Sequence, residues 1–352
     1  MSFLVPSALD LVSALNFTSM LSNIEESEEY IFDFSNTRTV EPFPMLLVSS
    51  QINRMADRLP NSRMVFSNYK HMTYAGHMGF FKAFGLDFGK LPGEAKGSSR
   101  YLPLTIFDCN TLIQQAAGKG NEVGDEVEEY SKRLAKILCS EDGAVYDTLA
   151  YSLRELMRNA VEHSNAKQFG VCAQYWPSKN KVEVAIFDRG IGLQASLRHN
   201  PHLDVSDDKR AVNYALMPAV SGKAFKGSRK QRGSWANSGF GLYMTSRICR
   251  NGGTFFVASG KTGMLITQKS EGKRYYPCNF EGTAVRMVVR TNQIAELRDA
   301  LETYRNEGYA IQNKYKEIVN IDPSAASLML SEDFDLSVWD KILLKLKGKK
   351  AS

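Results

Sequence analysis

The chain has 352 residues, enough for two domains of ordinary size, and its 43% hydrophobic and 23% charged residues are typical of a globular protein with a buried core. Its 44 basic and 38 acidic residues leave a formal charge of +6, a mild excess that argues against a nucleic-acid-binding protein. No apolar run approaches the roughly 18 residues of a membrane span, so we expect no membrane contact. No Lys or Arg precedes Arg38, so the charged start of a secretory signal is missing. Five scattered cysteines without a CxxC pair argue against metal or disulfide frameworks and favour a cytoplasmic protein.

The first third of the chain alternates helical and strand patterns. In chain order the apolar spacing predicts a helix at 7–24, a strand at 30–34, a helix at 45–55, a strand at 63–66, a helical stretch at 79–84 and a strand at 102–107. Strands that alternate with helices indicate a small, largely parallel α/β unit, which we assign to residues 1–118. The glycine-rich polar segment 116–126 is typical of a linker.

From about residue 127 the pattern changes to long helices followed by strands. The predicted elements are helices at 127–139 and 146–164, strands at 168–175 and 181–187, a helix at 207–217, a basic glycine-rich segment at 221–239, a helix from 241, strands near 254–258, 263–268 and 284–290, and a helix at 292–306. We assign residues 119–306 to a second domain and 307–352 to a helical extension. The amphipathic stretch 341–350 of this extension indicates a partner helix or a solvated end more than a membrane contact.

One predicted helix face carries three polar side chains. Glu155, Asn159 and His163 are spaced i, i+4, i+8 and therefore share this face. The carbonyl oxygen of an asparagine is a good Mg²⁺ ligand, and a carboxylate one turn earlier can orient or deprotonate an attacking water. The alternative is a solvated helix face with ordinary polar residues.

A glycine turn led by an aspartate follows the strand at 181–187. An ionised Asp188 only accepts hydrogen bonds, so it can take the amino hydrogen of adenine but not an oxygen-bearing base edge. Gly190 and Gly192 let the backbone approach a flat base without a Cβ clash. An ordinary strand-to-turn junction would have the same sequence.

The segment 221–232 carries five cations and no acidic residue. Lys223 and Lys226 are the first two of these cations, and a basic loop with glycines suits a lid over a triphosphate. A loop of this composition can also be solvated or can touch nucleic acid.

Two further short stretches complete the pattern. Gly239-Phe-Gly241-Leu242 begins a predicted helix, and free amides at the N-terminus of a helix bind phosphate. Thr283 follows Gly282 at the start of a predicted strand, where its hydroxyl either holds a water beside a base or belongs to an ordinary β-branched strand residue.

Four short stretches occur in one order along the chain: 155–159, 188–192, 239–242 and 282–283. In this order and spacing they resemble the GHKL, or histidine-kinase-like, ATPase family over roughly residues 127–292. The resemblance implies an α/β protein, in detail an α+β sandwich of the Bergerat type, with a mixed sheet backed by helices and ATP bound under a lid. It implies Asn159 as the Mg²⁺ ligand, Glu155 as the catalytic base and Asp188 as the residue that recognises adenine. The second glycine stretch departs from the family pattern, because Asn237 stands where a leading glycine is common. None of the five histidines is followed by Asp or Glu, which argues against orthodox histidine autophosphorylation.

The segment 33–45 resembles, more distantly, a STAS domain, the fold of anti-sigma-factor antagonists. Pro42 and Phe43 stand where the phosphorylatable members carry serines, so the resemblance implies a docking or regulatory module. A generic small α/β domain is an equal alternative.

Together these features predict an Mg²⁺-dependent ATPase that acts as a nucleotide-dependent switch in bacterial-type signalling, stress response or defence. Two alternatives stay open: a Ser/Thr protein kinase of the anti-sigma type that acts on a separate STAS-like partner, and an ATP-sensing adaptor with negligible turnover. We expect ATP and Mg²⁺ as ligands and a protein partner, either a small STAS-like protein or an effector. We also consider a homodimer, and expect no nucleic-acid or membrane partner.

Overall fold

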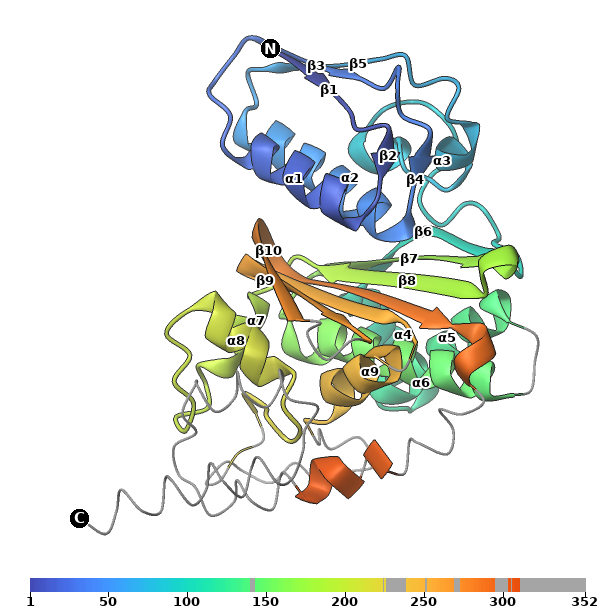
Figure 1. Ribbon diagram of the computed structural model, residues 1–352, viewed down its shortest axis with the longest axis vertical. Coiled ribbons are helices and arrows are strands. Elements are labelled where there is room, and N and C mark those ends of the chain that lie inside the picture. Colours follow the sequence, from blue (N-terminus) through green and yellow to red (C-terminus); the bar gives the residue numbers. More distant parts are fainter. Residues whose placement is uncertain are drawn as a thin grey trace.

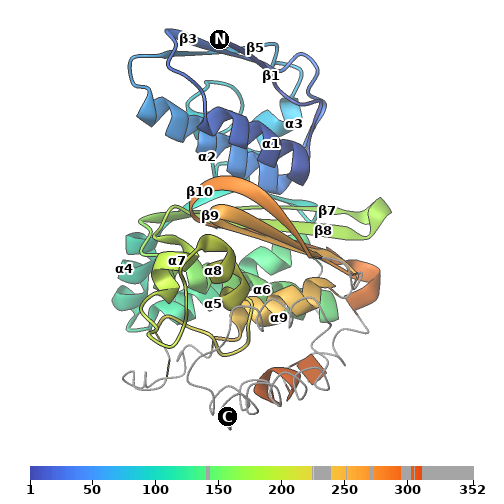
Figure 2. The same cartoon turned by 60° about the vertical axis from the view of Figure 1, so that its left-hand side comes forward.

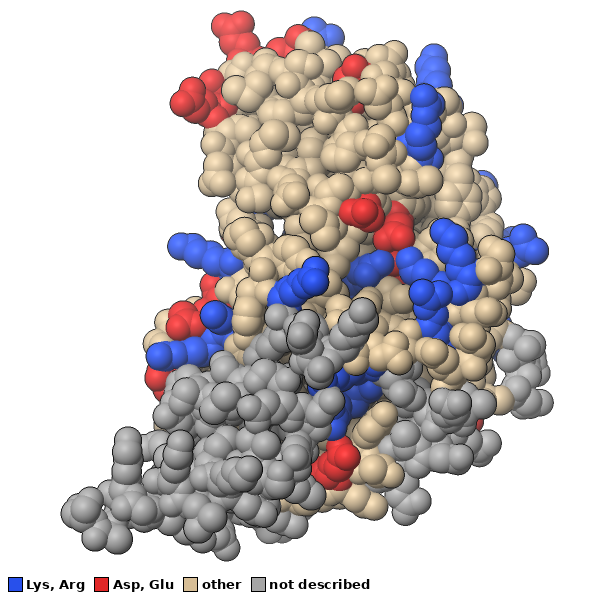
Figure 3. All heavy atoms as spheres, in the orientation of Figure 1, with Lys and Arg blue, Asp and Glu red and all other residues tan. Residues whose placement is uncertain are grey.

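The computed structural model describes residues 1–139, 143–223, 225, 239–250, 252–268, 273–294, 303–304 and 306–310. Figures 1 and 2 show these residues as four stacked layers: a small sheet, a pair of helices, a larger sheet and a second layer of helices. We call residues 1–100, which form the first two layers, the front unit. On the face shown in Figure 3, Lys and Arg side chains gather around the level of the larger sheet.

The front unit is a parallel α/β structure, as predicted. Its elements are β1 (Ser2–Leu4), β2 (Ala8–Leu9), α1 (Leu11–Ser22), β3 (Glu29–Asp33), β4 (Thr39–Val40), α2 (Pro42–Arg58), β5 (Arg63–Ser67), α3 (Thr73–His77) and a 3₁₀ turn (Lys82–Phe84). The strands β1, β3 and β5 pair in parallel in that order, and β2 pairs with β4 in parallel. Alternate residues of β3, Tyr30 and Phe32, are fully buried between this sheet and the helices, as the period of two requires.

The second part of the chain forms a five-stranded sheet with helices on one face. Its elements are β6 (Tyr101–Asp108), α4 (Cys109–Lys119), α5 (Val123–Leu138), α6 (Ala144–Arg158), a π-helical turn (Asn159–His163), β7 (Gln168–Trp176), a 3₁₀ turn (Pro177–Lys179), β8 (Lys181–Asp188), α7 (Gly192–Leu197), α8 (Asp208–Ala215), α9 (Gly241–Arg250), β9 (Thr254–Thr267), β10 (Lys273–Arg290) and a 3₁₀ turn (Thr291–Gln293). The strand order is β6-β7-β8-β10-β9. This is the α/β sandwich predicted from the sequence, but the pairing is antiparallel throughout the five described strands rather than mixed.

Several predicted elements differ from the structure. β6 is the edge strand of the larger sheet, although the residues 1–118 were assigned to the first domain. It has two apolar faces, since Leu102 packs among the helices of the second part and Leu104 packs against the front unit. The segment 116–126 is no linker, because the end of α4 and the start of α5 occupy it.

Other differences concern the ends of the chain and the long strands. The two strands predicted at 254–258 and 263–268 are one strand, β9, and the helical stretch predicted at 79–84 contains only the 3₁₀ turn at Lys82–Phe84, because α3 ends before it at His77. The predicted helix at 292–306 begins with a 3₁₀ turn, and 295–302 lie outside the described residues. Residues 311–352, which hold the amphipathic stretch, also lie outside them.

Both faces of the larger sheet carry buried apolar residues and are covered. The face toward α4–α9 contributes Val171, Val184 and Val285 to one core, while Phe256 on the opposite face belongs to the core of the front unit. The rings of Phe43, in α2, and Phe256 meet at 5.4 Å between centroids. The front unit is therefore packed directly on the back of the sheet, so α1 and α2 form the layer between the two sheets (Figure 2).

A buried cluster of charged side chains joins the first turn of α2 to the back face of the larger sheet. The carboxylate of Glu183 is fully buried, and its Oε2 lies 2.6 Å from Nη2 of Arg286, which is also 3.0 Å from Oε2 of Glu41. Lys181 lies 2.9 Å from Oε1 of Glu41. The backbone N–H of Phe43 donates to Oε1 of Glu183 at 3.2 Å, so a carboxylate of the sheet caps the helix. Pairing of this kind offsets the cost of burying the charges.

Candidate nucleotide site

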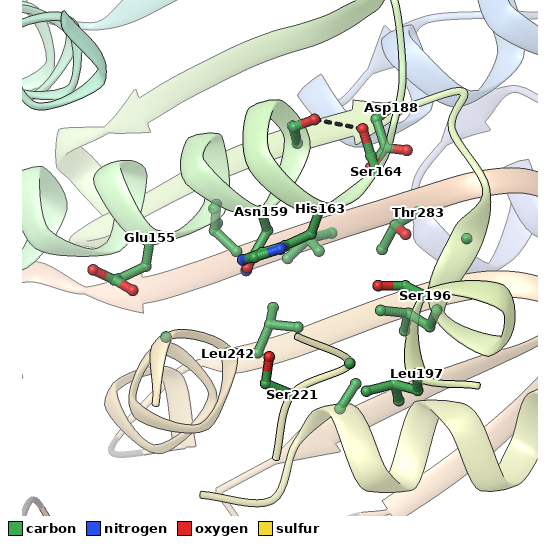
Figure 4. A pocket seen from close by; sticks show the side chains of 18 of the residues that line it. Glu155, Asn159, His163, Ser164, Asp188, Ser196, Leu197, Ser221, Leu242 and Thr283 are labelled. Atoms are coloured by element: carbon green, nitrogen blue, oxygen red, sulfur yellow. Dashed lines mark hydrogen bonds between the residues drawn. The ribbon is translucent and has the colours of Figure 1, made fainter. Parts of the chain in front are cut away.

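A pocket lies on the helical side of the larger sheet, and the four sequence stretches meet in it (Figure 4). α6 and its π-helical turn form one wall, β8 and β10 the back, and α7, the segment 220–222 and the start of α9 the other side. The lining includes eight residues predicted from the sequence: Glu155, Asn159, Asp188, Gly192, Gly239, Gly241, Leu242 and Thr283.

Asn159 opens the π-helical turn at the end of α6. Turns of this type are rare and are frequent at functional sites. The side-chain Nδ2 of Asn159 is buried, and the described residues offer it no hydrogen-bond partner. A buried amide without a partner costs free energy unless a ligand satisfies it, so the position is suited to hold one.

Asn159 is also the residue that would hold a magnesium ion, through its side-chain oxygen. Among the described residues, no group of three or more His, Cys, Asp or Glu side chains could hold a metal ion. Mg²⁺ commonly takes one or two protein oxygens and completes its shell with phosphate oxygens and waters. A single asparagine oxygen at the wall of the pocket fits that mode of binding.

Glu155 lies one helical turn before Asn159 and lines the same pocket. Its Oε1 accepts hydrogen bonds from Nε and Nη2 of Arg154, at 3.1 and 2.9 Å. Its other oxygen lies against the start of α9: a Cβ added at Gly241 would be 2.5 Å from Oε2. A side chain at this position would therefore force the carboxylate to move. Glu155 is thus held between an arginine and the N-terminus of a helix.

Asp188 and Thr283 form the opposite end of the pocket. They are directly paired residues of the antiparallel strands β8 and β10, so their side chains point to the same face (Figure 4). Oδ1 of Asp188 accepts the backbone N–H of Gly190 at 2.8 Å. Burial of the side chain nevertheless raises the pKa of Asp188 to about 7, against the lowering effect of backbone hydrogen bonds from Gly190 and Thr283.

Gly190 supports this end of the pocket without lining it. A Cβ at Gly190 would lie 1.9 Å from the backbone oxygen of Ser164, so the turn after Asp188 packs backbone to backbone on the end of the π-helical turn. The N–H of Ile191 donates to the same oxygen at 2.7 Å. The glycine joins the two walls of the pocket.

The predicted basic lid is described only at its start. Nζ of Lys223 donates to the backbone oxygen of Glu162 and is exposed at the edge of the site. Lys226 lies outside the described residues, as does Asn237.

Several lining residues were missed in the sequence. Ser164, Ser196 and Ser221 add hydroxyls to the pocket, and Ile186 and Val285 form its apolar floor. Ile186 could have been found, because it precedes Asp188 by two positions and so shares its face of β8. The serines carry no comparable signal. His163, which shares the helix face of Asn159, also lines the pocket, and burial lowers its pKa to about 4.

Comparison with known proteins agrees with this geometry. Residues 144–292 match the protein family described as Histidine kinase-, DNA gyrase B-, and HSP90-like ATPase. The match spans all four sequence stretches, and domains of this family bind ATP, generally with Mg²⁺. No curated protein matches the chain.

The front unit gains no family match, so its likeness to a STAS domain stays a prediction. Within the described ranges no helix is long and apolar enough to cross a membrane.

Proposed function

We propose that this chain binds Mg-ATP in the pocket between α6 and α9 and hydrolyses it, and that nucleotide state switches its contacts with a protein partner. The observation that carries the proposal is the placement of Asp188 and Asn159 at two ends of one pocket, with Glu155 beyond Asn159, whose buried Nδ2 has no hydrogen-bond partner among the described residues. Adenine and triphosphate require chemically different ends of this kind.

The end at Asp188 suits adenine. The ionised carboxylate accepts the exocyclic amino hydrogen of the base, and the hydroxyl of Thr283 beside it can hold a bridging water. Ile186 and Val285 offer an apolar surface to the ring. Guanine presents an oxygen where adenine has its amino group, so the carboxylate rejects it.

The end at Asn159 suits the phosphates. The amide oxygen of Asn159 would hold Mg²⁺, which when bound neutralises phosphate charge. The first backbone N–H groups of α9, at Gly241 and Leu242, have no partner within the helix and can donate to phosphate oxygens. Glu155 orients a water and takes its proton, while Arg154 keeps the carboxylate in one orientation.

The test is incubation of the purified protein with γ-labelled ATP and Mg²⁺, following free phosphate and labelled protein together. We expect Glu155→Ala to bind ATP without releasing phosphate, and Asn159→Ala to weaken Mg-ATP binding. Glu129→Ala, on an exposed part of α5, is the matched control and should behave as the wild type. Normal hydrolysis by Glu155→Ala would remove that residue as the base.

The same experiment separates the alternatives. Label transferred to an added STAS-like protein would indicate a Ser/Thr kinase, and tight binding with neither signal would indicate an ATP-sensing adaptor. Dimerisation, if it accompanies the switch, should then depend on nucleotide in sedimentation experiments. Failure to bind ATP would refute the whole proposal.

A further inference from the structure

The residue after Asp188 points away from the pocket and onto the front unit. Successive side chains at the end of β8 alternate between the two faces of the sheet, so Asp188 faces the pocket and Arg189 faces α2. Nε of Arg189 donates to Oγ of Ser50 at 3.0 Å, and Nη2 donates to the backbone oxygen of Ser50. The turn that carries the adenine-recognising carboxylate is thus tied to the middle of a front-unit helix.

A second tie reaches the other strand of the adenine end. Arg54 forms an ion pair with Glu281, two residues before Thr283. Between them, Gly282 packs on the same turn as Asp188, since a Cβ there would lie 2.1 Å from the backbone oxygen of Asp188. Ser50 and Arg54 are spaced i, i+4, so both ties come from one face of α2.

The two ties differ in what they hold. Glu281 lies within an irregularity in the pairing of β10 with β9, between Phe280 and Thr283, and its side chain contacts Arg54 of α2. Arg189 instead belongs to the turn that follows Asp188, and it donates hydrogen bonds to both the backbone oxygen and the hydroxyl of Ser50. Arg189 is exposed, so its contribution is that of surface hydrogen bonds rather than of a buried ion.

We propose that Arg189 is a positioning residue for nucleotide recognition: it holds the Asp188 turn against α2, so that the front unit sets the affinity and base selectivity of the pocket. This inference rests on the proposed function and assigns the regulation of the same site. Any partner that shifts α2 would alter the placement of Asp188 without touching the pocket.

The test compares nucleotide binding by wild type, Arg189→Gln and Arg189→Lys, with isothermal titration calorimetry for ATP and GTP and steady-state turnover. Loss of one or two hydrogen bonds predicts an ATP dissociation constant about 3- to 10-fold higher in Arg189→Gln. Turnover at saturating ATP should change by less than about twofold, because Glu155 and Asn159 are untouched. The preference for ATP over GTP should shrink, and Arg189→Lys should restore part of both effects.

Two controls keep the result specific. Arg63→Gln removes an exposed arginine of the front unit, which lies 3.7 Å from Glu29 and outside α2, and should leave binding unchanged. Ser50→Ala should weaken ATP binding in the wild type but add nothing in the Arg189→Gln background, since the contact is already gone.

The outcomes are distinguishable. Wild-type protein that binds ATP, with an Arg189→Gln variant of equal affinity and equal base preference, would overturn this inference and leave the proposed function standing. A loss of turnover without a loss of affinity would overturn it too, because that pattern belongs to a catalytic defect. Wild-type protein that binds no ATP would refute both.

Discussion

The buried carboxyl of Asp188 allows a test of the site without any nucleotide. Burial raises its pKa from 3.8 to about 7. Between these two pH values the folded protein keeps a proton on Asp188 that the unfolded chain releases. The associated stability is fully present below about pH 4 and is lost as the pH rises through about 7. Each unit of pKa corresponds to about 1.4 kcal/mol, so ionised Asp188 costs the folded protein about 4 kcal/mol at pH 8.

Asp188→Asn removes the titration and keeps the shape of the side chain. We expect the free energy of unfolding of the variant, minus that of the wild type, to rise by about 3 kcal/mol from pH 5 to pH 8 in urea denaturation. Replacement of the neutral carboxyl by an amide at the hydrogen bond from Gly190 changes this difference by the same amount at every pH, so its dependence on pH comes from Asp188 alone. The titration of His163, whose pKa burial lowers to about 4, is common to both proteins and cancels. A difference that is the same at every pH would refute the claim that the site desolvates Asp188.

Three further predictions concern the site and its support. ATP affinity should fall about tenfold from pH 8 to pH 6 in the wild type but not in Asp188→Asn, because the ionised carboxylate is a much stronger acceptor of the amino hydrogen than the neutral acid; calorimetry at each pH checks this. Gly241→Ala places a methyl 2.5 Å from Oε2 of Glu155 and should displace the carboxylate. Turnover should then fall by about tenfold or more, with the ATP dissociation constant nearly unchanged. An equal loss of turnover and of ATP affinity would contradict the role of Glu155. Glu183→Gln leaves Arg286 without its nearest carboxylate and should cost about 3 kcal/mol in urea denaturation; a loss below about 1 kcal/mol would show that the cluster is hydrated.

The chemistry of the pocket was predictable because each part of it is a short stretch with its own local geometry. Glu155 and Asn159 share a face through helical spacing alone, and Asp188 lies at the end of a strand that alternation identifies. The meeting of Asp188 with Thr283 depends on the register of β8 and β10, which spacing does not determine. The resemblance to an ATPase family supplied that step, since the family brings these stretches together.

The position of the front unit was not predictable in the same way. Alternation in β8 places Glu183 on the face opposite Val182 and Val184, and a charged residue on one face of a strand normally indicates solvent. The structure covers that face with α2, and Glu183 is fully buried beside Arg286. A period of two shows which residues share a face, but it carries no information about what lies against that face. For the same reason the pattern of β6 did not show that this strand pairs with the larger sheet rather than with the strands of the front unit.

The attachment of α2 at both ends changes what the front unit can do. Its first turn is capped by Glu183, while Ser50 and Arg54, further along, hold the two loops of the adenine end. The helix has 17 residues and is about 26 Å long, so it spans much of the sheet as one rigid element. A module joined by a mobile linker could change its contacts without disturbing the pocket. Here a displacement of α2 must either break its ties or carry the Asp188 turn with it, and nucleotide binding must, by reciprocity, resist or favour that displacement.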